Sequence, residues 1–165
     1  MLKYVDAKVV FAEVPDEVTL AINISNCPCQ CKGCHSSYLA QDIGKELTFD
    51  SLLRLCAGNN GISCVAFMGG DSEPSYINKL SEVLKVGELN LKVAWYSGRQ
   101  ELSTDINLKN FDYIKLGPYR EEFGPLNSRT TNQRFYKVHR KVVSGLVGYE
   151  LEDETYKFWK HETEN

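Results

Sequence analysis

The sequence has no long apolar run and no large excess of charge of either sign. No segment approaches the roughly 20 consecutive apolar residues that a membrane-spanning helix needs, so no membrane association is expected. The 19 Lys and Arg residues nearly balance the 22 Asp and Glu residues, and the formal net charge is -3. Because a nucleic-acid or membrane surface needs a strong basic bias, we expect neither as a partner.

The amino-terminal segment lacks the pattern of an export signal. Acidic residues interrupt each apolar run in MLKYVDAKVVFAEVPDE (residues 1–17), whereas a secretory signal has an uninterrupted apolar core. We therefore expect a cytoplasmic protein. Thiols stay reduced in that compartment, and clustered cysteines there bind metals or act in catalysis more often than they form disulfides.

Repeats, low-complexity tracts and Pro/Ser-rich linkers are also absent from the 165 residues. A chain of this length, with 42% hydrophobic residues, can bury one core and has little to spare for a second. We predict a single domain over residues 1–165. The charged tail from about residue 140 is expected either to be mobile or to pack a short helix with Phe158 or Trp159 on the body.

Apolar runs that alternate with amphipathic stretches predict an α/β fold. Strands are expected at residues 18–24, 62–68, 91–96 and 112–117, and helices at 49–57 and 75–85. Thr48 can cap the first helix and Gly58 can end it. Nearly continuous apolar strands separated by helices indicate a parallel sheet. An additional strand within residues 5–13 would run antiparallel to the first of these.

Three segments rich in cysteine, glycine or polar residues follow the ends of predicted strands. They are the cysteine loop NCPCQCKGCHSS (residues 26–37), Gly69–Gly70–Asp71 and Ser97–Gly98. Ligands of parallel α/β sheets gather at the carboxyl ends of the strands. We therefore expect these three segments to meet on one rim and to form the site.

The cysteine loop holds four of the six cysteines of the chain. A disulfide requires a defined separation and direction between its two cysteine side chains, so four thiols in so short a loop are poorly suited to forming disulfides. A metal ion or an iron–sulfur cluster places no such requirement on each pair of cysteines. Cys27, Cys31 and Cys34 are spaced C-x3-C-x2-C. Three thiolates hold three irons of a four-iron cluster and leave the fourth open to a substrate.

This spacing resembles the signature of the radical S-adenosylmethionine enzymes, in which the open iron chelates the amino and carboxylate groups of the cofactor's methionine part. In the general family an aromatic residue precedes the third cysteine, whereas here Gly33 precedes Cys34 and His35 follows it. A C-x-G-C segment followed by Tyr or His resembles the anaerobic ribonucleoside-triphosphate reductase activating proteins, a branch of the glycyl radical enzyme activases.

Other segments resemble the same activases over roughly residues 15–138. Gly69–Gly70–Asp71 resembles their Gly-Gly-Glu or Gly-Gly-Asp segment, whose backbone is expected to bind the methionine amino group. Tyr96–Ser97–Gly98 resembles a strand-end Tyr-Thr-Gly, in which Ser97 would offer a hydroxyl to the cofactor. Thr131–Asn132–Gln133–Arg134 resembles a recurring Ser/Thr-Asn-Gln-Arg block near the carboxyl end of the activases.

The resemblance implies a partial, open (β/α) barrel of the radical S-adenosylmethionine type with a mostly parallel sheet. It implies a [4Fe-4S] cluster on Cys27, Cys31 and Cys34. The implied S-adenosyl-L-methionine site comprises Gly33, Cys34, His35, Gly69, Gly70, Asp71 and Ser97. No catalytic residue beyond the cluster ligands is expected.

The resemblance also implies a reaction and two partners. The cluster would cleave the cofactor to a 5'-deoxyadenosyl radical, which would abstract hydrogen from a glycine of a class III anaerobic ribonucleotide reductase and leave a glycyl radical there. The reductase would present that glycine on a loop. A flavodoxin or ferredoxin-type donor would supply the electron.

Two alternatives stay open from the residues themselves. Another radical S-adenosylmethionine enzyme, acting on a different glycyl radical enzyme or a small molecule, would share the cysteine loop without needing the Thr-Asn-Gln-Arg block. A non-enzymatic zinc module would use the thiols and His35, although structural zinc sites usually join two separated ligand pairs. The glycine segments also have a simpler interpretation as turns, and Cys29, Cys56 and Cys64 are expected to bind no metal.

Overall fold

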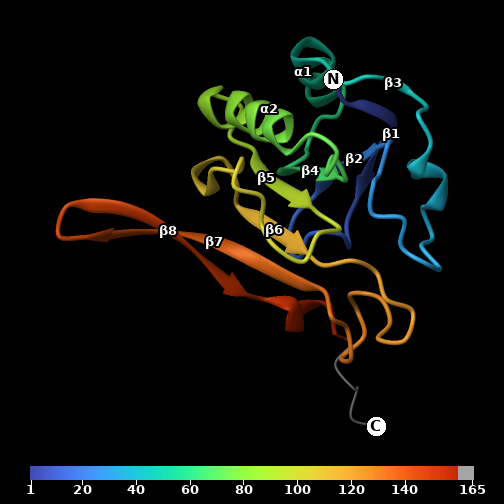
Figure 1. The fold of residues 1–165 in the computed structure, drawn as a ribbon. Coiled ribbons are helices and arrows are strands. Elements are labelled where there is room, and N and C mark those ends of the chain that lie inside the picture. The colour runs from blue at the N-terminus through green and yellow to red at the C-terminus, as the bar shows by residue number, and fades with distance from the viewer. Residues whose placement is uncertain (160–165) are drawn as a thin grey trace, which may run out of the picture.

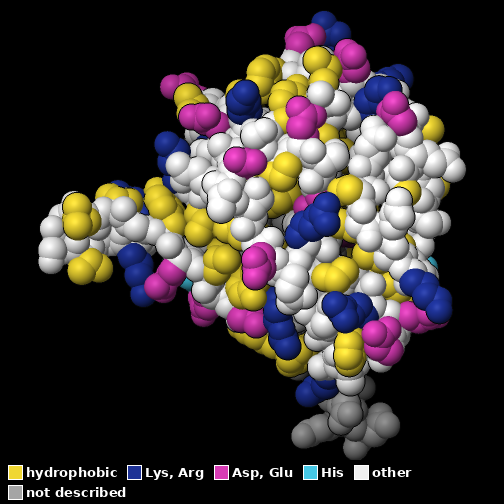
Figure 2. Space-filling model, viewed as in Figure 1, with side chains coloured by type: hydrophobic (Ala, Val, Ile, Leu, Met, Phe, Trp, Pro, Cys, Tyr) yellow, Lys and Arg dark blue, Asp and Glu magenta, His cyan; other side chains and the backbone are white. Residues whose placement is uncertain are grey.

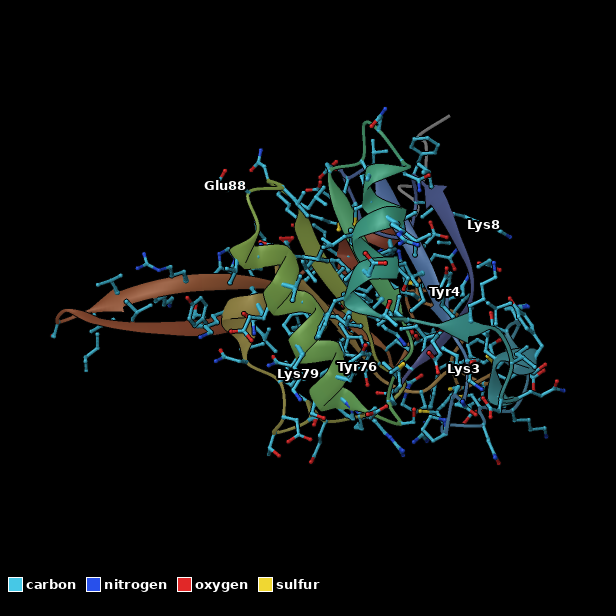
Figure 3. All side chains as sticks on the ribbon, turned by 90° about the horizontal axis from the view of Figure 1, so that it is seen from above. Lys3, Tyr4, Lys8, Tyr76, Lys79 and Glu88 are labelled. Carbon is cyan, nitrogen blue, oxygen red and sulfur yellow. The ribbon has the colours of Figure 1, made fainter. Side chains whose placement is uncertain are left out.

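The computed structural model describes residues 1–159 as a single eight-stranded sheet with two α-helices packed on one face (Figures 1 and 3). The strands are β1 (Lys3–Val10), β2 (Thr19–Ile24), β3 (Lys45–Glu46), β4 (Cys64–Met68), β5 (Lys92–Tyr96), β6 (Tyr113–Leu116), β7 (Arg134–Val143) and β8 (Leu146–Asp153). The helices are α1 (Phe49–Ala57) and α2 (Pro74–Val86). The order across the sheet is β3-β1-β2-β4-β5-β6-β7-β8.

The prediction of a partial (β/α) barrel with a mostly parallel sheet is wrong. β2, β4, β5 and β6 form three parallel pairs, but the other four pairs, β1–β2, β1–β3, β6–β7 and β7–β8, are antiparallel. β3 and β8 are the two edges of an open sheet, and residues 1–159 contain only two α-helices, whereas a barrel places a helix after each strand.

The connections explain why no barrel forms. Between β5 and β6 the chain makes only a short 3-10 turn, Leu108–Asn110. After β6, prolines and glycines at 117–118 and 124–125 interrupt any helix, and the chain returns as β7, antiparallel to β6. A further parallel βα unit therefore does not follow.

The individual elements predicted from the sequence are present. The predicted strand within residues 5–13 corresponds to β1, which pairs antiparallel with β2. α1 begins after Thr48, whose Oγ1 accepts a hydrogen bond from the Ser51 N–H at 3.0 Å while Ser51 Oγ accepts one from the Thr48 N–H at 2.8 Å. This reciprocal capping satisfies two amide donors at the helix start.

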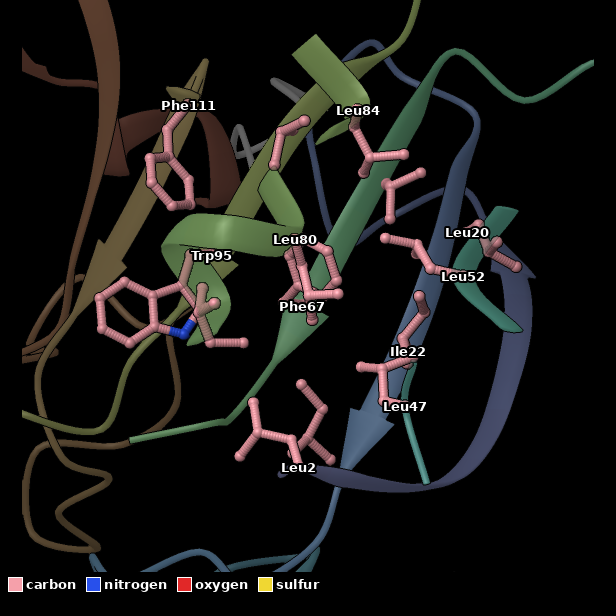
Figure 4. Close-up of a cluster of buried hydrophobic side chains, with 14 of the residues drawn as sticks. Leu2, Leu20, Ile22, Leu47, Leu52, Phe67, Leu80, Leu84, Trp95 and Phe111 are labelled. Carbon is pink, nitrogen blue, oxygen red and sulfur yellow. The ribbon is translucent and has the colours of Figure 1, made fainter. Parts of the chain in front are cut away.

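Alternation along the central strands divides the buried side chains between the two faces of the sheet. Val65 and Phe67 of β4 face the helices and pack with Leu52 of α1 and Leu80 of α2 (Figure 4). Cys64 and the neighbouring small side chains of β4 and β5 belong to a smaller cluster on the opposite face. Both helices thus cover one face, and loops and short segments cover the other.

The β7–β8 hairpin extends beyond the body of the molecule (Figures 1 and 2). Residues 140–150 are all exposed and are called the hairpin arm below; apolar side chains gather near its tip. The predicted tail from about residue 140 is therefore largely this hairpin. After β8, the 3-10 turn Thr155–Phe158 packs the Phe158 ring on Phe135 with 4.9 Å between centroids. The rest of the predicted tail, residues 160–165, lies outside the described residues.

Within residues 1–159, every helix is too short or too polar to cross a membrane.

Candidate functional site

A cavity of about 330 Å³ lies at the carboxyl ends of the parallel strands β2, β4, β5 and β6. The cysteine loop contributes Cys27, Cys29, Cys31, Cys34 and His35 to its lining. The strand ends contribute Gly69, Asp71, Ser97, Gly98 and Lys115, and the segment between β6 and β7 contributes Tyr119, Leu126 and Gln133. The three segments that the sequence places at strand ends therefore line one space.

The cysteine loop folds back on itself because several of its residues adopt left-handed backbone conformations. Asn26, Gln30 and Gly33 have φ values of 59°, 44° and 75°, which glycine and asparagine tolerate best. The loop is tied at its base by the Cys27 N–H, which donates to the Leu39 carbonyl at 2.9 Å. This path brings all four cysteine side chains of the loop to the cavity.

The thiols suit an iron–sulfur cluster chemically, because cysteine thiolates are its usual ligands. Their present positions are not those of metal ligands: within residues 1–159, no group of three or more His, Cys, Asp and Glu side chains is arranged to hold a metal ion. The fit to a cluster therefore rests on the chemistry of the four thiols and on their shared cavity.

Asp71 joins the cysteine loop to the ends of β4 and β5. Its buried carboxylate accepts hydrogen bonds from Ser97 Oγ at 2.5 Å and from the Gly98 N–H at 2.8 Å. The Cys29 thiol donates to the same carboxylate, with 3.6 Å between Sγ and Oδ2. The Ser97 hydroxyl, which the resemblance assigns to the cofactor, lines the cavity and donates its hydrogen bond to Asp71 in this structure.

Lys115 is a buried cation in the cavity wall and is not among the site residues predicted from the sequence. Its ammonium donates to the carbonyl of Ser97 at 3.2 Å and to that of Gly117 at 2.9 Å. Because an ammonium group has three N–H donors, one remains for a ligand. Burial lowers the pKa of Lys115 to about 8, although Asp71 and the nearby thiols act in the opposite direction. Its signal in the sequence is a lysine inside the otherwise apolar strand end YIKL.

The two glycines after β4 have different roles. Gly69 lines the cavity with φ +107°, and its carbonyl accepts a hydrogen bond from Trp95 Nε1 at 2.8 Å. Gly70 does not line the cavity. A Cβ on Gly70 would lie 2.6 Å from Ile77 Cδ1, so its α-carbon faces the hydrophobic core.

The remaining predicted cofactor residues lie in and beside the cavity. Cys34 and His35 line it, and the exposed His35 ring lies 6.1 Å from that of Tyr119 between centroids. Gly33 is outside the lining, where its α-carbon faces Tyr119 and Glu121. Cys34, His35, Gly69, Asp71 and Ser97 are therefore brought together, and Gly33 and Gly70 are not.

The Thr-Asn-Gln-Arg block supports one wall. Gln133 lines the cavity, and its N–H donates to Thr131 Oγ1 at 3.0 Å. Asn132 Nδ2 donates to the Pro118 carbonyl at 3.0 Å, which ties the block to the segment after β6. Arg134 lies 3.7 Å from Asp153 in an ion pair. One residue of the block thus faces the cavity while its neighbours hold the backbone.

Comparison with known proteins provides no relative from which to transfer a function. No family model, no curated protein and no solved structure matches this chain.

Proposed function

We propose that this protein activates an anaerobic ribonucleotide reductase, with a [4Fe-4S] cluster on Cys27, Cys31 and Cys34 and S-adenosyl-L-methionine as the second cofactor. The observation that carries the proposal is the cavity that the C-x3-C-x2-C loop shares with two strand ends and with Gln133; the strand ends contribute Gly69, Asp71, Tyr96, Ser97 and Gly98. These segments resemble one family and are far apart in the sequence. Their convergence favours a common ligand over a set of unrelated turns.

A cluster held by Cys27, Cys31 and Cys34 would supply the one-electron reduction of S-adenosylmethionine on which glycyl radical formation depends. The residues of the chain bind and orient. The third N–H of Lys115 is available to the methionine carboxylate, because Ser97 and Gly117 occupy the other two. Asp71, held by Ser97 and Gly98, is an acceptor for the methionine amino group.

Apolar side chains complete the cavity. Ile24, Leu39, Met68 and Leu126 line it. An apolar wall limits the access of water to the reacting groups. The proposed partners are a class III reductase that presents this glycine and a flavodoxin or ferredoxin-type electron donor. We place the reaction in the cytoplasm, where thiols remain reduced.

The test is anaerobic reconstitution with iron and sulfide, followed by incubation with S-adenosylmethionine and dithionite, with and without the candidate reductase. We expect a brown protein, 5'-deoxyadenosine by chromatography and, with the reductase, a glycyl radical signal by electron paramagnetic resonance. The triple variant Cys27→Ala/Cys31→Ala/Cys34→Ala should lose all three signals. Cys56→Ala, a cysteine change outside the loop, should lose none.

Other outcomes would contradict the proposal in different ways. A colourless protein that binds stoichiometric zinc through the loop would identify a zinc module. Formation of 5'-deoxyadenosine without a glycyl radical on any anaerobic reductase supplied would retain the cofactor chemistry and assign a different substrate.

A further inference from the structure

The strand β8 forms one edge of the sheet, and its outer side has no backbone partner within residues 1–159. Along the hairpin arm this edge also stands clear of the body of the molecule (Figures 1 and 2). We propose that the β8 edges of two copies of this chain pair antiparallel about a two-fold axis and form a reversible homodimer. The inference does not depend on the proposed function.

β8 lacks the features by which edge strands avoid pairing with other chains. Such strands are commonly very short, or they carry a proline, a bulge or inward-pointing charges. β8 is eight residues long and contains no proline. Its pairing with β7 runs from Asp153 to Leu146 without a register shift, and its first four residues, LVGY, carry no charge. This edge is therefore a ready template for another strand.

The arm has a second free edge, on the outer side of β7, and this one is protected. β6 pairs with β7 only from Arg134 to Lys137, so among the described residues no strand lies beside the rest of β7. His139, Arg140 and Lys141 follow one another there. Lysine on an edge strand opposes pairing, and two copies of this edge would bring like charges together. Of the two edges, β8 is the one suited to pairing with itself.

One face of the arm carries a row of apolar side chains. Residues paired across antiparallel strands lie on the same face, so Val142 and Val147 share a face, and Tyr149 and Leu151 continue it along β8. Leu151 packs against the hydrophobic cluster beneath the helices, whereas Val142 and Val147 are 57% and 51% exposed. The row thus begins at the core and runs outward, and apolar side chains beside β8 would extend it.

Self-pairing of β8 has a register that joins apolar side chains to apolar side chains. In a two-fold antiparallel pair, the residue on the axis lies opposite its own copy, and its neighbours pair reciprocally. An axis at Tyr149 places this ring opposite its own copy and places Val147 opposite Leu151 of the second copy, twice by symmetry. Aromatic and aliphatic cross-strand pairs of this kind stabilise antiparallel sheets.

The acidic residues of β8 exclude the registers beyond Tyr149. An axis at Glu150 would set this residue against its own copy, and an axis at Leu151 would set Glu150 against Glu152 of the second copy. Like charges directly opposite each other destabilise a sheet. An axis before Tyr149 shortens the ladder, because β8 begins at Leu146. Tyr149 is therefore the position about which β8 pairs best with itself.

With the axis at Tyr149, no two acidic side chains face each other. Glu152 lies opposite Leu146 of the second copy, and Glu150 lies opposite Gly148 of the second copy. Pairing of two edges of this length buries about 1,000 Å² in total, which is at the lower end of specific interfaces. We therefore expect a dissociation constant in the micromolar range.

The test is sedimentation velocity of the purified 165-residue chain, with reductant present so that no disulfide joins two copies. We expect a monomer–dimer equilibrium between about 1 and 500 µM. Val147→Lys should raise the dissociation constant of the dimer at least about 10-fold, because it sets a charge against Leu151 of the second copy. Val86→Lys on α2, at a side chain that is 77% exposed, is the control and should change it less than about 2-fold. Thermal melting confirms that each variant is folded.

Two substitutions of Leu146 test the register. Leu146→Glu sets a like charge against Glu152 of the second copy and should raise the dissociation constant about 5-fold, whereas Leu146→Lys sets an opposite charge there and should not raise it. Adding Glu152→Lys to Leu146→Glu should restore the wild-type value. Equal effects of the two Leu146 variants would overturn the inferred pairing.

Val142→Lys separates pairing of the edges from packing of the arm faces. Val142 lies on the same face as Val147 but on β7, one strand away from the β8 edge, so the change should be less than about 3-fold. A loss as large as that in Val147→Lys would mean that the apolar faces pack on each other, which would overturn the inference. A chain that stays monomeric over the whole range, or a dimer that Val147→Lys leaves unchanged, would overturn it as well.

Discussion

The thiol of Cys29 is hydrogen-bonded to the carboxylate of Asp71, and the pair is pressed against Gly98. A Cβ on Gly98 would come within 2.7 Å of Cys29 Sγ and 3.7 Å of Asp71 Oδ2. Burial, followed by the Asp71 charge, raises the pKa of Cys29 to about 12. The Cys29 thiol therefore stays protonated and hydrogen-bonded to Asp71, although Cys29 lines the same cavity as Cys27, Cys31 and Cys34.

The first prediction concerns which thiols hold the cluster. Cys27→Ala, Cys31→Ala and Cys34→Ala should each abolish a stable four-iron cluster, because three thiolates at this spacing form the ligand set. Cys29→Ala should keep it. Iron and sulfide analysis of each reconstituted variant provides the measurement. Retention in Cys27→Ala together with loss in Cys29→Ala would show that the wrong three cysteines were chosen.

The second prediction concerns Lys115. Lys115→Met removes the cation that faces the cavity, and we expect the Kd for S-adenosylmethionine to rise about 10-fold or more, since hydrogen bonds to charged groups contribute roughly 1.5–3 kcal/mol. Iron content should stay unchanged. Equilibrium binding by the reconstituted protein measures the effect.

Lys79→Met, an exposed lysine on α2, is the control for Lys115→Met. Loss of Lys115 also leaves two carbonyls without their donor, so melting of both variants is measured in parallel. Normal cofactor affinity in a folded Lys115→Met variant would remove this lysine from the binding site.

The third prediction compares two glycines that both have positive φ. Gly70 has φ +96° and Gly61 has φ +85°, but a Cβ on Gly61 would meet nothing within 4 Å, whereas one on Gly70 would lie 2.6 Å from Ile77. Each change to alanine imposes backbone strain of about 1–3 kcal/mol. Gly70→Ala should cost at least about 1 kcal/mol more, because it also overpacks the core. Urea unfolding of both variants decides this, and equal losses would contradict the position of Ile77.

The fourth prediction concerns the pH dependence of stability through Glu17. Burial alone would raise the pKa of this carboxyl, but hydrogen bonds from Lys92 and Ser63, among others, outweigh burial and hold the pKa below its usual value of 4.5. Glu17 therefore stabilises the fold above the unfolded-state pKa, and this contribution is lost as the pH falls through the lower, folded-state pKa.

Glu17→Gln should lower the free energy of unfolding by roughly 1–3 kcal/mol at pH 7. The difference from the wild type should shrink as the pH falls below about 4.5. Denaturant unfolding at pH 7, 5 and 3 measures it, with the exposed Glu88→Gln as the control. A difference that stays constant down to pH 3 would mean that the lost stability does not come from the ionised carboxylate.

The elements that the sequence predicts well are those that depend on neighbouring residues alone. α1 begins after Thr48 because its hydroxyl satisfies an amide donor at the helix start, and this requires no distant residue. The apolar runs that form β2, β4 and β5 are buried on both faces of the sheet, and such continuous runs predict parallel strands. The C-x3-C-x2-C spacing is likewise a local property, since all its thiols lie on one short loop.

Tertiary structure alone decided the features that depend on distant partners. The chain after β6 becomes β7 because it pairs with the exposed edge of β6, so the sheet stays open and mixed instead of closing into a barrel. Gly70 and Gly69 are adjacent in the sequence, yet Ile77 determines that Gly70 faces the core. Lys115 faces the cavity because the carbonyls of Ser97 and Gly117 hold its ammonium there. Periodicity along the chain carries no information about which remote groups will meet a side chain, and those contacts set its orientation and its role.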